Sequence, residues 1–215
     1  MRKQDNDLLT KTDAGTPMGD LIRQYWIPAV KSEDLENDAP PTRLRLLGEN
    51  LIAFRTTSGK VGIFEHHCPH RCASLYYGRN EDEGIRCVYH GWKFDVSGQC
   101  VETPTESADS NMKDQVRATA YQTRERGGLI WVYMGSAEQA PELPAFEANA
   151  LPEGMRWVKC GLRECNWLQA LEGDIDTAHL SFLHLGALDA EQFPPGSPAH
   201  YFQKDKAPKF EVLDT

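Results

Sequence analysis

The sequence predicts an α+β chain, in which an antiparallel all-β domain is followed by the start of a second, helix-containing domain. Three observations lead to this fold class. Short stretches with an apolar period of two, separated by tight turns, fill about the first two thirds of the chain. A proline-rich connecting segment then follows at residues 141–154. A strong helical pattern of apolar residues comes next, at residues 166–184.

The N-terminal residues are predicted to be helical. Residues 4–11 are expected to form a short helix, and Thr16 followed by Pro17 is typical of a helix start with threonine at the cap. The apolar residues of MGDLIRQYW continue at near-helical spacing. We therefore assign residues 1–26 to an N-terminal helical segment.

The apolar period changes to two from residue 27. Strands are predicted at residues 43–48, 51–56, 61–65, 119–125 and 129–135, and in the stretches IRCVYH, WKFDV and QCVE. Glycine-containing turns join them, including Ser97-Gly98 and Gly127-Gly128. Short strands connected in this way indicate an antiparallel sandwich or barrel, and we assign residues 27–140 to it.

The remaining residues, 141–215, are predicted to begin a second domain. The pattern indicates a strand at 155–162, a helix at 166–184, a loop at 193–198 and a strand from residue 209. About 75 residues bury a poor core on their own. We therefore expect this chain to be the N-terminal part of a longer protein, with an incomplete second domain.

The bulk composition excludes several functional classes. The chain has 32 acidic and 23 basic residues, a net charge of -9, which argues against nonspecific nucleic-acid binding. No apolar run approaches the roughly 20 residues that cross a bilayer, and no apolar segment follows the first basic residues as in a secretory signal. We predict a cytoplasmic protein, in which the six cysteines are reduced.

Two short boxes in the first domain have the spacing of metal ligands. Cys68 and His70 are separated by one residue, and Cys87 and His90 by two. Each box offers one thiolate and one imidazole, which suits a two-iron cluster with both thiolates on one iron and both imidazoles on the other. The usual zinc-finger pattern instead places two cysteines before two histidines. A zinc-binding interaction module stays as an alternative.

The boxes resemble those of the Rieske iron–sulfur domain, and the resemblance spans roughly residues 27–136. It implies a [2Fe–2S] cluster bound by Cys68, His70, Cys87 and His90. In the respiratory branch of that family each loop carries an additional cysteine. The second box, CVYHGW, has none, so the sequence resembles the oxygenase branch more closely.

Other cysteines and histidines receive structural interpretations. Four cysteines outside the boxes are expected to be buried or incidental, because free cysteine is often buried: Cys72, Cys100, Cys160 and Cys165. His66 and His67 precede the first box but match no ligand position, and we interpret them as loop or surface residues.

The predicted helix at 166–184 carries a second set of candidate ligands. Asp176 and His179 are three residues apart and therefore share one helix face. His184 lies five residues beyond His179, about 140° away around a regular helix. The two imidazoles can share a metal only if the helix distorts or ends near Leu180–Phe182, for example through a π-bulge. A solvated polar helix face is the alternative interpretation.

Together with the N-terminal TPMGDLIRQYWIPA, this stretch resembles Rieske non-haem iron aromatic ring-hydroxylating oxygenases of the phthalate-dioxygenase-like branch. The resemblance implies a helix-grip-type catalytic domain in which His179 and His184 bind a mononuclear iron. It also implies that Asp176 links this iron to a Rieske cluster across a subunit boundary. The third, carboxylate ligand is expected beyond this chain, since none of the later acids has the expected context: Asp189, Glu191, Asp205, Glu211 and Asp214.

The function implied by the resemblance is that of an oxygenase alpha subunit in aromatic hydrocarbon catabolism. Electrons would pass from the [2Fe–2S] cluster to a mononuclear Fe(II) that activates dioxygen, in a dioxygenase, monooxygenase or O-demethylase reaction. The implied partners are a flavin and iron–sulfur reductase, an aromatic substrate and further copies in a homotrimer. The alternative is a Rieske ferredoxin-like electron-transfer protein, which needs nothing like the helix at 166–184.

Overall fold

The computed structural model describes residues 1–184, 193–197, 200–201, 206–207, 209 and 211. The chain divides into two compact units, Met1–Gly161 and Leu162–Thr215. None of the helices within the described residues is long and apolar enough to span a membrane. The predicted boundaries after residues 26 and 140 are finer than this division and stay predictions.

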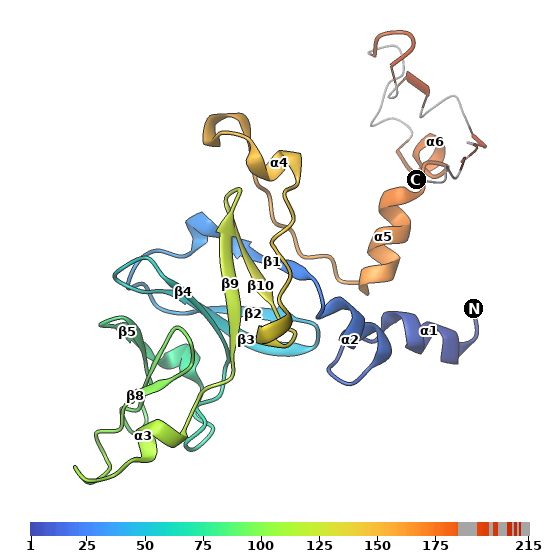
Figure 1. Cartoon of the computed structure of the whole chain (residues 1–215). Helices are drawn as coiled ribbons and strands as arrows, with labels where there is room; N and C mark the ends of the chain where they lie inside the picture. Colours follow the sequence, from blue (N-terminus) through green and yellow to red (C-terminus); the bar gives the residue numbers. More distant parts are fainter. Residues whose placement is uncertain (185–192, 198–199, 202–205, 208, 210, 212–215) are drawn as a thin grey trace. The chain divides into compact units, whose positions relative to one another are not determined.

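The first unit is built on two antiparallel sheets (Figure 1). The larger sheet has the order β1-β10-β9-β4-β3-β2, with β1 Trp26–Lys31, β2 Thr42–Leu46, β3 Glu49–Arg55, β4 Val61–Glu65, β9 Ala120–Arg126 and β10 Leu129–Tyr133. The smaller sheet has the order β5-β6-β7-β8, with β5 Arg79–Glu81, β6 Gly84–Arg86, β7 Lys93–Asp95 and β8 Cys100–Glu102. Every strand predicted before residue 136 has its counterpart, so the antiparallel all-β first domain is confirmed.

Helices in the first unit are short. They are α1 Lys3–Thr10, α2 Pro17–Ile22, α3 Met112–Gln115 and α4 Glu147–Ala150, with single 3₁₀ turns at Ser32–Asp34, Leu75–Tyr77, Ala137–Gln139 and Glu153–Met155. The predicted start of α2 is confirmed, because the Gly19 N–H donates to Thr16 Oγ1 at 3.1 Å with Pro17 in the first turn. The helix ends at Ile22, so the near-helical spacing up to Trp26 does not extend it.

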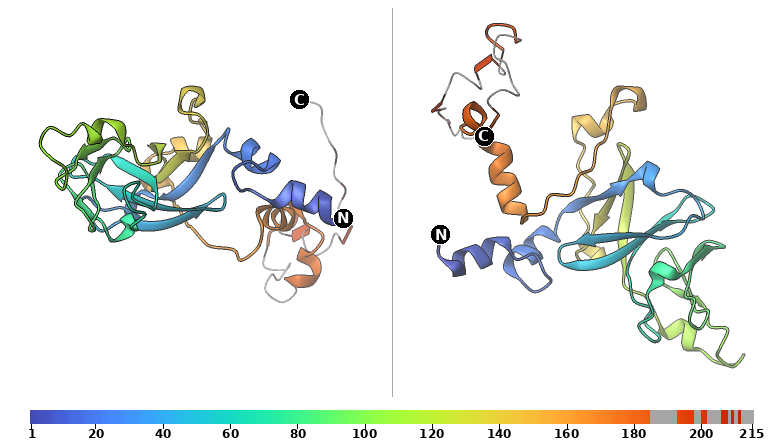
Figure 2. Two further views of the ribbon diagram at one scale, coloured as in Figure 1. Left: turned by 90° about the horizontal axis from the view of Figure 1, so that it is seen from below. Right: turned by 180° about the vertical axis from the view of Figure 1, so that it is seen from behind.

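Strand β3 is buried on both faces, and two cores follow from this. Ile52 and Phe54 point into a core that also holds the buried residues of the two cysteine boxes. The alternate residues Leu51 and Ala53 join a second core with β10 on the opposite face. Figure 2 shows the smaller sheet extending from one side of the larger one. The first core therefore fixes the two boxes against a rigid sheet.

Two predictions for the segment after residue 154 are wrong. No strand forms at 155–162; Met155, Trp157 and Leu162 are 70%, 83% and 93% exposed, because no described strand pairs with this stretch. The helix at 166–184 is two helices, α5 Trp167–Ile175 and α6 Leu180–Leu183.

The end of the chain offers fewer tests of the sequence. The loop at 193–198 is confirmed for residues 193–197. The strand predicted from residue 209 lies largely outside the described residues.

Candidate functional site

The first cysteine box forms a closed turn directly after β4. The Cys68 N–H donates to the Ala73 carbonyl at 2.8 Å, and the Cys72 N–H donates back to the Cys68 carbonyl at 2.9 Å. Cys72 has a left-handed backbone, with φ of 54°. This turn brings the side chains of Cys68 and His70 to the same end of the first unit.

The second box repeats this turn position by position. The Cys87 N–H donates to the Trp92 carbonyl at 2.8 Å, and the Gly91 N–H donates to the Cys87 carbonyl at 3.0 Å. Gly91 occupies the position equivalent to Cys72 and is also left-handed, with φ of 75°. A Cβ at Gly91 would lie 2.8 Å from Pro104 Cγ, so glycine is required by both conformation and space. Two equivalent turns therefore face one another.

The four predicted cluster ligands come together between these turns. Cys68 and Cys87 are 1% and 2% exposed, and their side chains interact. The rings of His70 and His90 lie nearer the surface, with centroids 4.6 Å apart. Sulfur is thus paired with sulfur inside and imidazole with imidazole outside, which is the grouping that the sequence predicts for two irons. Their role as ligands stays a prediction.

The protonation states suit metal binding. Burial raises the pKa of the Cys68 thiol, so two adjacent buried thiolates need a compensating cation. The backbone N–H groups of His70 and Arg71 point at the Cys68 sulfur and oppose this effect. Partial burial, followed by the neighbouring His90, lowers the pKa of His70. The ring of His70 is therefore neutral near pH 7, the form that binds a metal.

The spread of the donors is compatible with two irons rather than one central ion. Among the described residues, no three of the four donor atoms from Cys68, His70, Cys87 and His90 fall within 4.8 Å of one another. One tetrahedral zinc would require all four donors around a single point, with bonds of about 2.0–2.3 Å. The residues present therefore fit a two-iron cluster better than a mononuclear site.

Two residues that support the site were not identified from the sequence. Trp92 is 3% exposed and stacks on the His70 ring, with centroids 4.3 Å apart and planes 8° apart. Arg86 Nη1 donates to the Gly91 carbonyl at 2.8 Å, and the same guanidinium pairs with Glu102 at 2.8 Å. The register of the short hairpins is the feature that could have predicted this ion pair. Arg86 and Glu102 both lie opposite Lys93 of β7, one on each neighbouring strand.

In the second unit the helix breaks where the predicted iron-site residues lie. Asp176 ends α5, and its Oδ1 accepts the Ala178 N–H at 2.8 Å. Its Oδ2 accepts a hydrogen bond from His179 Nδ1 at 3.1 Å. The bonds from Ala178 and then His179 lower the pKa of Asp176. This break lies before His179, where the Asp176 side chain satisfies the backbone in place of a helical turn. The condition set from the sequence, that the helix distorts or ends near Leu180–Phe182, is met instead by the end of α6 at Leu183.

Both histidines follow this break and lie close to one another. His179 and His184 flank the single turn of α6, and their ring centroids are 5.4 Å apart. With Nδ1 of His179 held by Asp176, its Nε2 is left for a metal, an arrangement common around ligating histidines. Of the later acids, Glu211 is exposed and the others lie outside the described residues: Asp189, Glu191, Asp205 and Asp214.

The remaining cysteines differ from the expectation in part. Cys100 is 2% exposed, as predicted. Cys72, Cys160 and Cys165 are exposed instead, because they lie on a surface turn and on the extended segment before α5.

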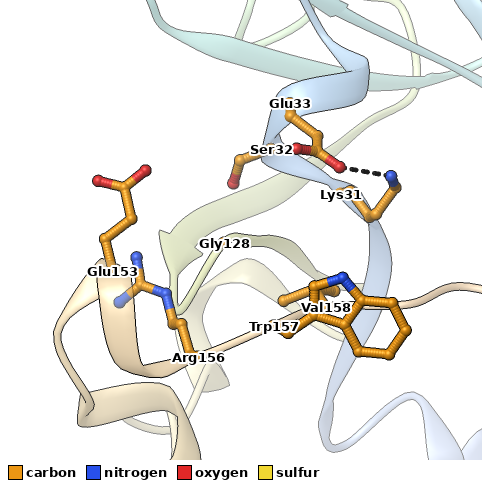
Figure 3. Close-up of a pocket in the computed structure, with 8 residues that line it drawn as sticks. All are labelled: Lys31, Ser32, Glu33, Gly128, Glu153, Arg156, Trp157 and Val158. Carbon is orange, nitrogen blue, oxygen red and sulfur yellow. Dashed lines mark hydrogen bonds and ion pairs between the residues drawn. The ribbon is translucent and has the colours of Figure 1, made fainter.

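A surface cavity of about 450 Å³ lies elsewhere on the first unit (Figure 3). It lies between the end of β1, the β9–β10 turn at Gly128 and residues 153–158. Lys31 in its wall is paired with Glu33, while Trp157 and Arg156 form the opposite side. None of the predicted metal ligands lines this cavity.

Comparison with known proteins decides the family. A family model described as the Rieske [2Fe-2S] domain matches residues 25–122. The oxygenase subunit of 3-chlorobenzoate-3,4-dioxygenase from Comamonas testosteroni is 49% identical over 99% of this chain and 49% of its own length. The oxygenase subunit of phthalate 4,5-dioxygenase from Pseudomonas putida is 47% identical over the same shares. The chain belongs to the Rieske oxygenase family. Its phthalate-dioxygenase-like character, predicted from the sequence, is confirmed.

The Rieske oxygenase chain spans about half the length of the curated relatives it matches. Among solved structures it is similar to NdmA of Pseudomonas putida CBB5, with a TM-score of 0.63 and 26% identity. That match covers 82% of this chain and 55% of NdmA. The predicted fold class, an antiparallel Rieske domain followed by part of a helix-containing region, is therefore confirmed.

Proposed function

We propose that this chain provides the cluster-bearing part of the oxygenase subunit of a Rieske aromatic oxygenase. The observation that carries the proposal is the pair of equivalent turns with buried thiols and outer imidazoles. In this proposal Cys68 and Cys87 bind one iron of a [2Fe–2S] cluster, and His70 and His90 bind the other.

The residues of the chain set the conditions for electron transfer. When bound, the cluster stores one electron reversibly and a mononuclear iron activates dioxygen. Burial of Cys68 and Cys87 keeps water from the sulfurs, and the N–H groups of His70 and Arg71 stabilise negative charge on sulfur. The partly exposed ring of His90 leaves a short path from the inner thiols to the surface.

The second unit supports the oxygenase assignment over a ferredoxin-like one. We propose His179 and His184 as two ligands of a mononuclear Fe(II), with a third carboxylate ligand outside this chain. Asp176 orients the His179 ring and is proposed to face His90 of a neighbouring copy, which implies a homotrimer. The second candidate function, a Rieske ferredoxin-like protein, does not require Asp176, His179 and His184.

The proposed substrate is an aromatic carboxylate, and the proposed electron donor is a flavin and iron–sulfur reductase. Two relatives carry the names of a chlorobenzoate and a phthalate dioxygenase, and both names denote benzoate-type acids. Ring dioxygenation is the reaction that these names favour. Product analysis with a benzoate, a phthalate and a methoxybenzoate distinguishes dioxygenation from monooxygenation and O-demethylation.

Iron and acid-labile sulfide, measured after anaerobic reconstitution, test the proposal. We expect two irons with two sulfides in the cluster, and one further iron when the full-length protein supplies the third ligand. His90→Gln should remove the cluster, whereas His179→Gln should remove only the further iron. Absence of labile sulfide would overturn the proposal. A full-length protein that binds the cluster but no further iron would favour the ferredoxin-like alternative.

Asp176→Asn tests the proposed bridge. The variant should keep all metal but lose product in a single turnover from a pre-reduced sample, because the amide cannot accept both hydrogen bonds as the carboxylate does. Asp174→Asn is the matched control, since Asp174 lies on α5 and pairs with Arg163 of the preceding segment, not with His179. A normal product yield from Asp176→Asn would rule out the bridging role.

A further inference from the structure

Three residues directly before the first turn form a cluster that the iron sites do not use. Glu65 is the last residue of β4, and His66 and His67 follow it. Within the described parts of the chain, they are the group of three histidine, cysteine or acidic side chains whose ligand atoms all lie within 4.8 Å of one another. We propose that Glu65, His66 and His67 bind a divalent transition-metal ion of the zinc type.

The carboxylate of Glu65 stands between the two imidazoles. Its Oε1 lies 2.6 Å from His67 Nδ1 and 4.0 Å from His66 Nε2. Its Oε2 accepts the backbone N–H of His67 at 2.8 Å. Zinc binds nitrogen and oxygen at about 2.0–2.2 Å, so two donors on one ion lie roughly 3–3.5 Å apart. The two observed separations bracket that value, so a small rotation of the side chains brings all three donors onto one ion.

The surrounding backbone holds these side chains in register. The His66 carbonyl accepts the Leu75 N–H at 2.7 Å, and His67 forms a bridge with Ser74 across the turn. Ser74 Oγ also lies 3.4 Å from His66 Nδ1. The second ring nitrogen of a ligating histidine usually has a hydrogen-bond acceptor, and Ser74 Oγ can serve as one here. The backbone positions of His66 and His67 are therefore fixed by the turn, and only side-chain rotation is needed to form the site.

The donor set and its exposure define the class of ion. Two imidazoles with one carboxylate and no thiolate favour borderline ions such as Zn²⁺ over Ca²⁺ or Mg²⁺, which prefer oxygen. The side chains of Glu65, His66 and His67 are 33%, 26% and 48% exposed. An ion can enter from solvent, and water completes its coordination, as in open zinc sites.

The position of this site gives it a consequence beyond binding. His67 is adjacent to Cys68 in the chain, so a bound dication lies close to the cysteine box. If the proposed cluster is present, the added positive charge favours its reduced form and raises its reduction potential. The binding itself does not depend on the cluster.

Equilibrium dialysis against Zn²⁺, followed by metal analysis, tests the site on tag-free, cluster-loaded protein. We expect His66→Gln and His67→Gln each to weaken the binding of one zinc ion per chain by roughly tenfold or more. His200→Gln is the control, because His200 lies outside the cluster and should leave zinc binding unchanged. Equal iron and labile sulfide in all samples shows that the variants fold.

The outcomes separate this site from the proposed function. The proposed site would be overturned if the unchanged protein, His66→Gln and His67→Gln bound the same amount of zinc with the same affinity. This holds whether or not the cluster is present. Glu65→Gln provides a second test if a histidine variant loses the cluster. Zinc bound at this site should also raise the cluster potential, and the rise should vanish in His66→Gln. A protein without labile sulfide that still loses one zinc in His66→Gln would contradict the proposed function and support the site.

Discussion

Replacing Gly91 by alanine tests how the second turn is held. Gly91 has φ of 75°, and its carbonyl accepts Arg86 Nη1 while its N–H donates to the Cys87 carbonyl. A Cβ at this position would lie 2.8 Å from Pro104 Cγ. Because a proline ring cannot rotate away, either the ring or the turn has to move. We expect both lower stability and lower cluster content.

The expected cost has two parts. A left-handed conformation costs an ordinary L-residue about 1–2 kcal/mol relative to glycine. Moving the Cβ and Pro104 Cγ from 2.8 Å to the 3.4 Å at which ordinary contact begins requires a shift of about 0.6 Å. Overpacking of this kind typically costs about 1–3 kcal/mol. The free energy of unfolding should therefore fall by about 2–5 kcal/mol in Gly91→Ala.

Two control variants separate these parts. Gly59 has φ of 84°, and a Cβ added there would meet no atom within 4 Å, so Gly59→Ala should cost only the conformational part, about 1–2 kcal/mol. In a Pro104→Ala background the ring is gone, and Gly91→Ala should cost no more than Gly59→Ala. Urea unfolding followed by far-UV circular dichroism gives the free energies, and visible absorption gives the cluster content.

Equal costs for Gly91→Ala and Gly59→Ala would show that the contact with Pro104 is unimportant. An undiminished cost in the Pro104→Ala background would lead to the same conclusion. If Gly91→Ala kept full stability and full cluster content, the required left-handed conformation would be refuted as well.

Three further predictions follow from the first unit. Cys72→Gly should stabilise the protein by about 0.5–1 kcal/mol in urea unfolding without loss of iron, because Cys72 holds a left-handed φ of 54° that glycine adopts without strain; loss of iron would instead make it a ligand. Trp92→Ala should cost about 3–5 kcal/mol, because a side chain only 3% exposed leaves a cavity, and lower cluster content; unchanged visible absorption and stability would contradict this. Hydrogen bonding to Arg55 lowers the pKa of Glu125 from 4.5, so this pair stabilises the fold above about pH 4.5 and its contribution is lost as pH falls through the lower folded pKa. Glu125→Gln should flatten that acid-side fall in the urea midpoint, and an unchanged pH profile would count against the pair.

The hairpins were predictable from the sequence because their turns are local. Gly59, Gly98 and Gly127 all have positive φ, and a glycine at such a position indicates a turn without knowledge of the rest of the fold. The order of the larger sheet depends on pairing between β1 and β10, about a hundred residues apart. No local pattern encodes that pairing, so β1 was seen only as the start of an alternating stretch.

The wrong predictions after residue 154 have two different physical causes. The apolar residues of 155–162 alternate like a strand, but a strand needs a partner for its backbone, and none of the described strands provides one. The apolar stripe at 166–184 predicts one helix. Asp176 ends it because its carboxylate binds the Ala178 N–H, a side-chain competition that periodicity alone does not weigh.

The end of α6 explains how His179 and His184 come close despite their five-residue spacing. On an unbroken helix the rings of His179 and His184 would point about 140° apart. The chain between them is instead the single turn α6, in which the Phe182 N–H donates to the His179 carbonyl at 3.0 Å, and it ends at His184. The two ring centroids therefore lie 5.4 Å apart. Asp176 therefore does two things with one carboxylate: one oxygen ends the helix, and the other orients His179. Replacing it perturbs ring orientation and chain direction together, which is why metal retention in Asp176→Asn has to be measured alongside turnover.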